Sequence, residues 1–268
     1  MTEYAAMPDA IAFTQVEKRF GKGRAPAIAD LSFSVSAGEH VCIVGRTGCG
    51  KSTAVNLILG LAEASAGRVR VLGVDPLRDF NRLRGRIGCV FQTDRLLPWR
   101  SALDNVLVPL EILRARSSGT EAQAVELLHK VGLAGHEQAY PQQLSGGMRQ
   151  RVALARALIT QPEVMIADEA FGALDEVTAA ALRGDFQRIA KARGQTVLQI
   201  THSLDEALSM ADRVLVFDRP GRVVGEFPRA QWETPAQRQV VRQALRTLIA
   251  GEAEIEADAG TAGVRRAA

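Results

Sequence analysis

The chain has 268 residues, of which 47% are hydrophobic and 24% are charged, as in an ordinary globular protein. This length allows a large buried core, either as one α/β domain with an attached subdomain or as two small domains. The formal net charge of +3 is small for the length and no basic block stands out. We therefore expect a solvated surface and no nucleic-acid partner.

The cysteines and the hydropathy argue against several further classes. Cys42, Cys49 and Cys89 are odd in number and lack C-x-x-C spacing, which argues against a disulfide framework and a zinc site. Cys42 and Cys89 lie in apolar strand-like runs and are expected in the core, whereas Cys49 is expected to be exposed. The N-terminal residues show no signal-peptide pattern, and no stretch approaches the roughly 18 to 20 apolar residues of a membrane span. If the protein works at a membrane, we expect another chain to span it.

The first predicted strands, residues 11–16 and 31–35, alternate apolar and polar side chains. This period of two is typical of a partly exposed antiparallel sheet. Phe20 lies between them, just before a glycine-rich turn. On local sequence it either packs into the core or stacks on a nucleotide base.

Residues 45–53 fit the phosphate-binding pattern G-x-x-x-x-G-K-[ST], between an apolar run at 41–44 and a helical stretch at 53–62. Glycines let successive backbone N–H groups face an anion, and the helix N-terminus adds partial positive charge. Lys51 is expected to reach the β- and γ-phosphates, and Ser52 to bind Mg²⁺. The alternative is a glycine-rich turn that contains Lys-Ser by chance. The predicted nucleotide-binding residues of this loop are Gly45, Arg46, Thr47, Gly48, Cys49, Gly50, Lys51, Ser52 and Thr53.

A strand is also expected at residues 67–72, and polar side chains follow three further predicted strands. They are Gln92 after residues 86–91, Asp168 and Glu169 after residues 164–167, and His202 after residues 196–200. Ligand sites in α/β sheets gather at the carboxyl ends of strands. Asp168 is therefore the expected Mg²⁺ partner, and Glu169 the residue that orients or deprotonates an attacking water. His202 is placed for a γ-phosphate contact; a structural ion pair and a structural histidine are the alternatives.

The remaining chain is predicted mostly helical. Residues 101–133 form two helices broken at 117–120, which indicates a helical insert. Ser145-Gly146-Gly147 then begins a helix to about residue 160, where it either receives an anion or serves as a helix cap. The last expected elements are a helix at 176–193, a hairpin of 213–217 and 222–227, a helix at 237–250, and a disordered tail at 251–268.

Residues 144–150 closely resemble the signature motif of ATP-binding cassette (ABC) transporter ATPases, and the resemblance extends over residues 11–227. The other matching motifs are the phosphate loop, Gln92 of the Q-loop, Asp168 and Glu169 of Walker B, residues 172–175 of the D-loop, the switch His202, and Phe20 as the adenine-stacking aromatic. The resemblance implies an α/β fold: a P-loop RecA-like nucleotide-binding core with an antiparallel β subdomain and an α-helical signature subdomain.

The resemblance also implies a site shared between two copies of the chain. ATP bound at Lys51 of one copy would be closed over by the signature residues of a second copy in a head-to-tail dimer. The implied signature contacts are Ser145, Gly146, Gly147 and Gln150; the implied catalytic residues are Glu169, His202, Gln92 and Lys51; and the implied Mg²⁺ ligands are Ser52, Gln92 and Asp168.

The segment 91–100, with Leu-Leu-Pro-Trp, looks like the Q-loop region of importers for nitrate, taurine and aliphatic sulfonates. This likeness implies an ATP-hydrolysing subunit, peripheral on the cytoplasmic face of the membrane, that docks on permease subunits near Gln92 and Trp99. Trp99 either lines that surface or packs within the helical insert. A solute-binding protein would act only indirectly.

The expected division of the chain is a disordered N-terminus at 1–10, an ATP-binding core at 11–92 and 161–230, a helical subdomain at 93–160, and a terminal helix with a tail at 231–268. Two other functions fit the sequence less well. A soluble ABC-type ATPase for nucleic acid or ribosomes is disfavoured, because no long coiled coil fits between Gln92 and Leu144 and only one cassette is present. A small-molecule kinase leaves the signature unexplained.

Three residues depart from the family pattern. Ala170 stands where proline is usual, Ala167 replaces a larger aliphatic residue, and Ser203 stands where aspartate is common. We expect the first two to loosen the backbone around Glu169 and to slow turnover or loosen its coupling without abolishing chemistry.

Overall fold

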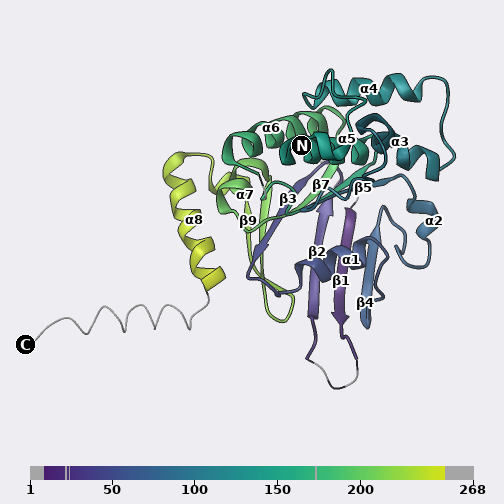
Figure 1. Ribbon diagram of the computed structural model, residues 1–268. Helices are drawn as coiled ribbons and strands as arrows, with labels where there is room; N and C mark the ends of the chain where they lie inside the picture. The colour runs from purple at the N-terminus through teal and green to yellow at the C-terminus, as the bar shows by residue number, and fades with distance from the viewer. Residues whose placement is uncertain (1–8, 22, 24, 173, 251–268) are drawn as a thin grey trace, which may run out of the picture.

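The computed structural model describes residues 9–21, 23, 25–172 and 174–250, and it contains two β-sheets surrounded by helices (Figure 1). The larger sheet has six strands. Its first five strands are parallel, and the last two form an antiparallel hairpin, as predicted. In spatial order the strands are β5 (Ile87–Phe91), β6 (Val164–Asp168), β7 (Thr196–Ile200), β3 (His40–Gly45), β8 (Arg213–Asp218) and β9 (Arg222–Pro228).

The central strands of this sheet are buried on both faces. Every residue of β3 and of β7 is buried, which agrees with their continuous apolar runs. Because parallel strands end at the same edge, the residues that follow β5, β6, β7 and β3 are brought to one side of the sheet. The functional motifs occupy this edge.

The smaller sheet is antiparallel, as the alternating pattern predicts, and packs on the larger one. Its strands are β2 (Ile28–Ser36), β1 (Asp9–Lys18) and β4 (Ala66–Val71), in that order. Phe13 of β1 stacks on Phe33 of β2 with ring centroids 4.7 Å apart. Phe33 in turn meets the edge of Phe217 of β8 at 5.9 Å. This aromatic contact joins the two sheets.

Three helices of the predicted insert lie together at one end of the molecule (Figure 1). They are α3 (Ala102–Ile112), α4 (Thr120–Lys130) and α5 (Gly146–Leu158). Their apolar faces meet in one core that includes Leu107, Leu128 and Leu154. Buried Asn105 donates to the carbonyls of Leu97, Arg100 and Ser101, and this fixes the segment that leads into α3.

The other helices cover the sheets. They are α1 (Lys51–Ile58), α2 (Phe80–Leu83), α6 (Glu176–Ala192), α7 (Leu204–Met210) and α8 (Pro235–Ala250), with short 3-10 helices at Pro141–Gln143 and Arg229–Gln231. α8 lies on the side of the molecule away from α3 and α4 (Figure 1). It buries Val241 and Leu245 against Trp232. The predicted fold class, an α/β core with an antiparallel sheet and a helical part, is confirmed.

Several boundaries differ from the sequence predictions. α1 occupies Lys51–Ile58 instead of residues 53–62, because Gly50 and Gly60 adopt left-handed conformations on either side of it. α7 was not predicted, because a helix of 7 residues is too short to show a helical period in the sequence. Asp9 and Ala10 belong to β1 and not to a disordered N-terminus. Residues 1–8 and the tail at 251–268 lie outside the described residues, and the domain boundaries remain predictions.

Candidate functional site

The phosphate-loop sequence forms the turn between β3 and α1. Gly45 has no space for a side chain, since a Cβ there would lie 2.2 Å from the carbonyl oxygen of Phe217. Gly50 is the N-cap of α1 and has φ 103°, a conformation that side chains disfavour. The loop thus leads directly into a helix N-terminus, whose backbone N–H groups and dipole favour an anion.

Lys51 lies across this loop. Its side chain is 8% exposed, and its Nζ donates to the carbonyl oxygens of Gly45 at 2.7 Å and Arg46 at 3.0 Å. The ammonium group is therefore held at the loop, where its positive charge attracts an incoming phosphate. Ser52, the next residue, is exposed.

The expected exposure of Cys49 is wrong. Its side chain is fully buried, and its Sγ lies 3.8 Å from the Nζ of Lys51. Cys49 packs in the core cluster that includes Ile43 and Ala54, so the loop turns this side chain away from solvent. Cys42 is buried as predicted, whereas Cys89 is only partly buried.

The structure brings together the polar residues that follow the parallel strands. Gln92 follows β5, Asp168 and Glu169 end β6, and His202 follows β7, and these three strands are neighbours. The Nδ1 of His202 lies 3.9 Å from the Oε2 of Glu169. Gln92 and His202 are exposed, while the two carboxylates are half-buried.

Ionisation of both Asp168 and Glu169 costs free energy unless a cation lies nearby. Burial raises the pKa of Asp168, and the adjacent Glu169 raises it further, while Lys51 and Arg95 lower it. Glu169 also has φ 49°, in the left-handed region, and its N–H donates to the carbonyl of Ile200 at 2.9 Å. Strained backbone and crowded charge at one point are typical of functional sites.

The predicted Mg²⁺ ligands fit a metal that arrives with a nucleotide. Within the described ranges, no group of three or more His, Cys, Asp or Glu side chains is arranged to hold a metal ion. Ser52, Gln92 and Asp168 instead offer hydroxyl, amide and carboxylate oxygens. Mg²⁺ accepts such oxygen ligands and is commonly held by one or two carboxylates together with substrate phosphates.

The signature residues begin α5. Ser145 is the N-cap, and its Oγ accepts from the N–H of Met148 at 3.3 Å, so the predicted helix cap is present. Ser145 and Gly146 are nevertheless exposed. In the described part of the chain, no hydrogen bond or ion pair joins Ser145 or Gly147 to Lys51. The signature therefore leaves its exposed face free for another molecule.

Gln150 has a different place from the one that the resemblance implied. It is 4% exposed, and its Nε2 donates to the carbonyls of Phe91 at 2.8 Å and Ala170 at 2.7 Å. Both amide hydrogens are thus committed within the protein, which corrects the expectation of a nucleotide contact. Gln150 fastens α5 to the residues next to Gln92 and Glu169.

The D-loop precedes α6. Asp175 is the N-cap of this helix, and its Oδ1 accepts from the N–H of Thr178 at 3.0 Å. This hydrogen bond lowers the pKa of Asp175. Ala173, the middle residue of the predicted D-loop, lies outside the described residues.

The two aromatic residues singled out by sequence are both exposed. Phe20 is 49% exposed, which rules out the core alternative, and the Nζ of Lys18 lies 4.9 Å from its ring centroid. Trp99 is 70% exposed, which rules out packing within the helical insert. Each ring is available to a ligand or partner.

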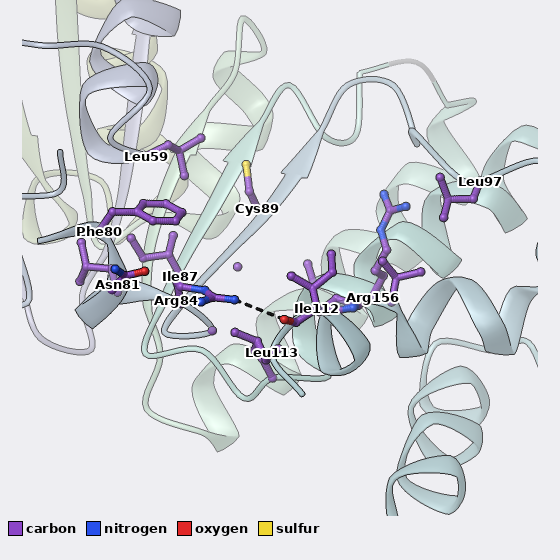
Figure 2. Close-up of a pocket in the computed structure, with 17 residues that line it drawn as sticks. Leu59, Phe80, Asn81, Arg84, Ile87, Cys89, Leu97, Ile112, Leu113 and Arg156 are labelled. Atoms are coloured by element: carbon purple, nitrogen blue, oxygen red, sulfur yellow. Dashed lines mark hydrogen bonds between the residues drawn. The ribbon is translucent and has the colours of Figure 1, made fainter. Parts of the chain in front are cut away.

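A cavity of about 680 Å³ opens between α2, β5 and α3, and its lining residues were not identified from sequence (Figure 2). Phe80 and Ile112 lie on opposite sides, and Leu97 of the Q-loop segment also lines it. The Nη2 of Arg84 donates to the carbonyl of Ile112 at 3.2 Å, so one hydrogen bond links the two sides. Cys89 lines the cavity too, and burial raises the pKa of its thiol to about 12. The cavity forms only when distant elements meet.

A phosphate loop at the head of α1, beside an acidic pair at the end of a parallel strand, defines a phosphate-loop nucleotide-binding protein. The sequence profile of the ABC transporter family matches residues 28–172. The chain belongs to this family and is an ATP-binding cassette ATPase.

Individual relatives and a solved structure agree. The chain is 42% identical over 234 residues to the nitrate import ATP-binding protein NrtD of Synechococcus elongatus, covering 85% of this chain and 84% of that protein. It is 44% identical over 192 residues to an aliphatic sulfonates import ATP-binding protein of Rhodococcus jostii, covering 72% and 73%. A dimeric ATP-binding cassette bound to ADP and Pi superposes with a TM-score of 0.73 at 31% identity, over 82% of this chain and 98% of that one.

Proposed function

We propose that this chain is the ATP-hydrolysing subunit of a membrane importer for a small anion such as a sulfonate, taurine or nitrate. Relatives similar to it are named as import ATP-binding proteins for nitrate, aliphatic sulfonates, taurine and bicarbonate. A methionine import ATP-binding protein is also 42% identical, so identity at this level does not by itself select the solute. The common element of these names is import.

Hydrolysis is assigned to the residues at the ends of the parallel strands. Lys51 binds the phosphates, Glu169 orients or deprotonates the attacking water, and His202 contacts the γ-phosphate from its place 3.9 Å from Glu169. Ser52, Gln92 and Asp168 would hold Mg²⁺, which would neutralise phosphate charge. Phosphoryl transfer depends mainly on such positioning and electrostatic stabilisation.

The site is completed by a second copy of the chain. The exposed Ser145 and the partly exposed Gly147 offer the hydroxyl and backbone donors of a helix start, and nothing in the described part of their own chain pairs them with Lys51. A head-to-tail dimer supplies these donors to ATP bound at the opposite phosphate loop. The similar cassette with ADP and Pi is a dimer.

The surface near Gln92 is suited to contact a partner protein. The cavity between α2 and α3 has exposed Phe80 and Ile112 at its sides, and Trp99 lies exposed two residues beyond its lining residue Leu97. Large exposed apolar side chains in one region are typical of an interaction site. Among the described residues, no helix has the length and apolar character to cross a bilayer. We therefore infer that permease subunits dock here and hold the chain at the cytoplasmic face.

Co-purification tests this function. The tagged full chain is isolated from detergent-solubilised membranes, and its partners are identified by mass spectrometry. A permease recovered with wild type and lost with Trp99→Ala supports the proposal, and Trp232→Ala, at a buried Trp away from the cavity, controls for general destabilisation. Recovery with ribosomes or DNA in place of a permease would overturn it. The transported solute is then identified as the one that stimulates ATP hydrolysis by the reconstituted complex.

A further inference from the structure

His202 projects from a short turn that is fixed by buried groups on both sides. Thr201, directly before it, is 2% exposed, and its N–H donates to the carbonyl of Ile43 at 3.3 Å. The Oγ1 of Thr201 accepts from the N–H of Ser203 at 3.0 Å. The backbone on either side of His202 is therefore tied by one threonine.

Glu206 lies beneath this turn as a buried carboxylate. It is on α7, is 4% exposed, and accepts a short hydrogen bond from the Nε2 of Gln199. Burial raises the pKa of this carboxylate, and the Thr201 side chain acts to lower it. The carboxylate thus contacts the strand that leads to His202.

Gln199 is itself held in one orientation. It is fully buried, and its Oε1 lies 2.8 Å from the Nε2 of His40. Because the Nε2 of Gln199 donates to Glu206, its Oε1 must accept, and His40 therefore carries its proton on Nε2. Burial lowers the pKa of His40, which keeps the ring neutral. Hydrogen bonds thus connect His40 through Gln199 to Glu206.

Helix capping does not explain Glu206. Ser203 is the N-cap of α7 and accepts from the N–H of Glu206 at 3.3 Å, so the sequence Ser-x-x-Glu has the form of a capping box. In a capping box the glutamate reaches back to the N-cap N–H. Here the Ser203 N–H instead donates to Thr201, and the Glu206 carboxylate accepts from Gln199. The carboxylate is therefore directed to the strand that leads to His202.

The charges around Glu206 agree with this direction. Arg183 of α6 and His202 act to lower the pKa of Glu206, and Glu206 in turn raises the pKa of the buried Cys42 of β3. Arg183 also donates to Glu176 at 2.6 Å. A buried carboxylate is costly without a function or a cation, and Arg183 and His202 are neighbours whose positive charge offsets that cost when present.

We propose that Thr201 and Glu206 are positioning residues that hold His202 in place for ATP hydrolysis. Neither side chain touches the nucleotide in this assignment. Glu206 holds Gln199 on the strand that leads to His202, and the Thr201 hydroxyl fixes the turn that presents His202 beside Glu169. The inference rests on the proposed role of His202 in hydrolysis.

Steady-state hydrolysis by the purified chain tests the proposal, with kcat and KM for ATP measured separately. Thr201→Val removes the hydroxyl at nearly constant volume, and Thr201→Ser retains it. The matched control is Thr196→Val, at the opposite end of β7, where a 2% exposed threonine accepts from the N–H of Gly38 at 3.0 Å. We expect Thr201→Val to lower kcat about tenfold with little change in KM, while Thr201→Ser and Thr196→Val stay near wild type.

The outcomes separate positioning from general stability. If Thr201→Val retains the kcat of Thr196→Val, or if Thr201→Ser is as slow as Thr201→Val, the proposal is wrong. If Thr201→Val does not fold, Glu206→Gln decides: a lowered kcat at unchanged KM supports the proposal, and the wild-type kcat overturns it. A wild-type chain no faster than Glu169→Gln would instead contradict the proposed hydrolysis site.

Discussion

The side-chain amide of Gln150 donates a 2.7 Å hydrogen bond to the backbone carbonyl of Ala170, directly after Glu169. Its second hydrogen goes to the carbonyl of Phe91, directly before Gln92. The helix that begins with Ser145 is therefore fastened to two strand ends of the nucleotide site. One buried amide thus joins α5 to both strand ends.

Gln150→Leu is expected to destabilise the chain by about 2 kcal/mol, because it removes the donor to one buried and one part-buried carbonyl at similar side-chain volume. Urea unfolding measures the loss. The matched control is Gln187→Leu on α6, whose Nε2 makes longer bonds of 3.4 and 3.2 Å to the carbonyls of Ser209 and Met210. Equal unfolding free energies for the two variants would contradict the role given to Gln150.

Lys51→Ala is expected to weaken ATP binding about tenfold or more, because the loop then offers an anion only its backbone donors. The variant also loses the bonds of Lys51 to Gly45 and Arg46. Calorimetric titration with ATP and Mg²⁺ measures the affinity. Lys191→Ala, at an exposed position on α6, should bind as wild type does. An unchanged affinity in Lys51→Ala would remove Lys51 from the site.

Glu169→Gln is expected to bind ATP and to accumulate as a closed dimer while turnover falls about 100-fold or more, because the amide cannot accept the proton of water. Size-exclusion chromatography with ATP and a phosphate-release assay measure the two effects. Glu163→Gln, which breaks the exposed 2.5 Å pair with Arg86, is the control. Wild-type hydrolysis in Glu169→Gln would refute the assigned role.

Motifs that are local in sequence could be predicted, and features that depend on distant contacts could not. The phosphate loop and the acidic pair are read from consecutive residues, so their positions after β3 and at the end of β6 agree with the structure. Gln150 lies in a motif too, but its partners Phe91 and Ala170 come from elsewhere in the chain. The direction in which a loop side chain points also cannot be predicted from the sequence. For this reason the expected exposure of Cys49 is wrong.

Ala170→Pro is expected to raise the rate of ATP hydrolysis or its coupling to transport. Glu169 has φ 49° in this chain, and a following proline restricts the preceding residue toward extended conformations. The substitution therefore changes the backbone conformation at Glu169, the carboxylate that we propose acts in hydrolysis. Phosphate release by the reconstituted complex, with and without solute, measures both quantities. Ala167→Val, at the fully buried position on β6, separates the effect of strand packing. An unchanged rate and coupling in Ala170→Pro would contradict the prediction.

Glu206→Gln is expected to make the chain more stable at pH 8 than wild type, with a smaller difference near pH 4. Burial raises the pKa of Glu206, and the hydrogen bonds from Thr201 and Gln199 and the charges of Arg183 and His202 only partly oppose this. An acid whose folded pKa lies above its unfolded value destabilises the fold once it ionises, so the penalty is absent below the unfolded pKa and complete above the folded one. The glutamine keeps an acceptor for Gln199 and removes the charge.

Urea unfolding of wild type and Glu206→Gln at both pH values measures this difference. Glu176→Gln is a suitable control, since that carboxylate pairs with Arg183 at 2.6 Å but is 84% exposed. A difference that does not grow between pH 4 and pH 8 would contradict the buried charge at Glu206. A variant that is more stable yet slower in hydrolysis would show that the carboxylate is kept for its effect on His202, because a purely structural residue does not trade stability for turnover.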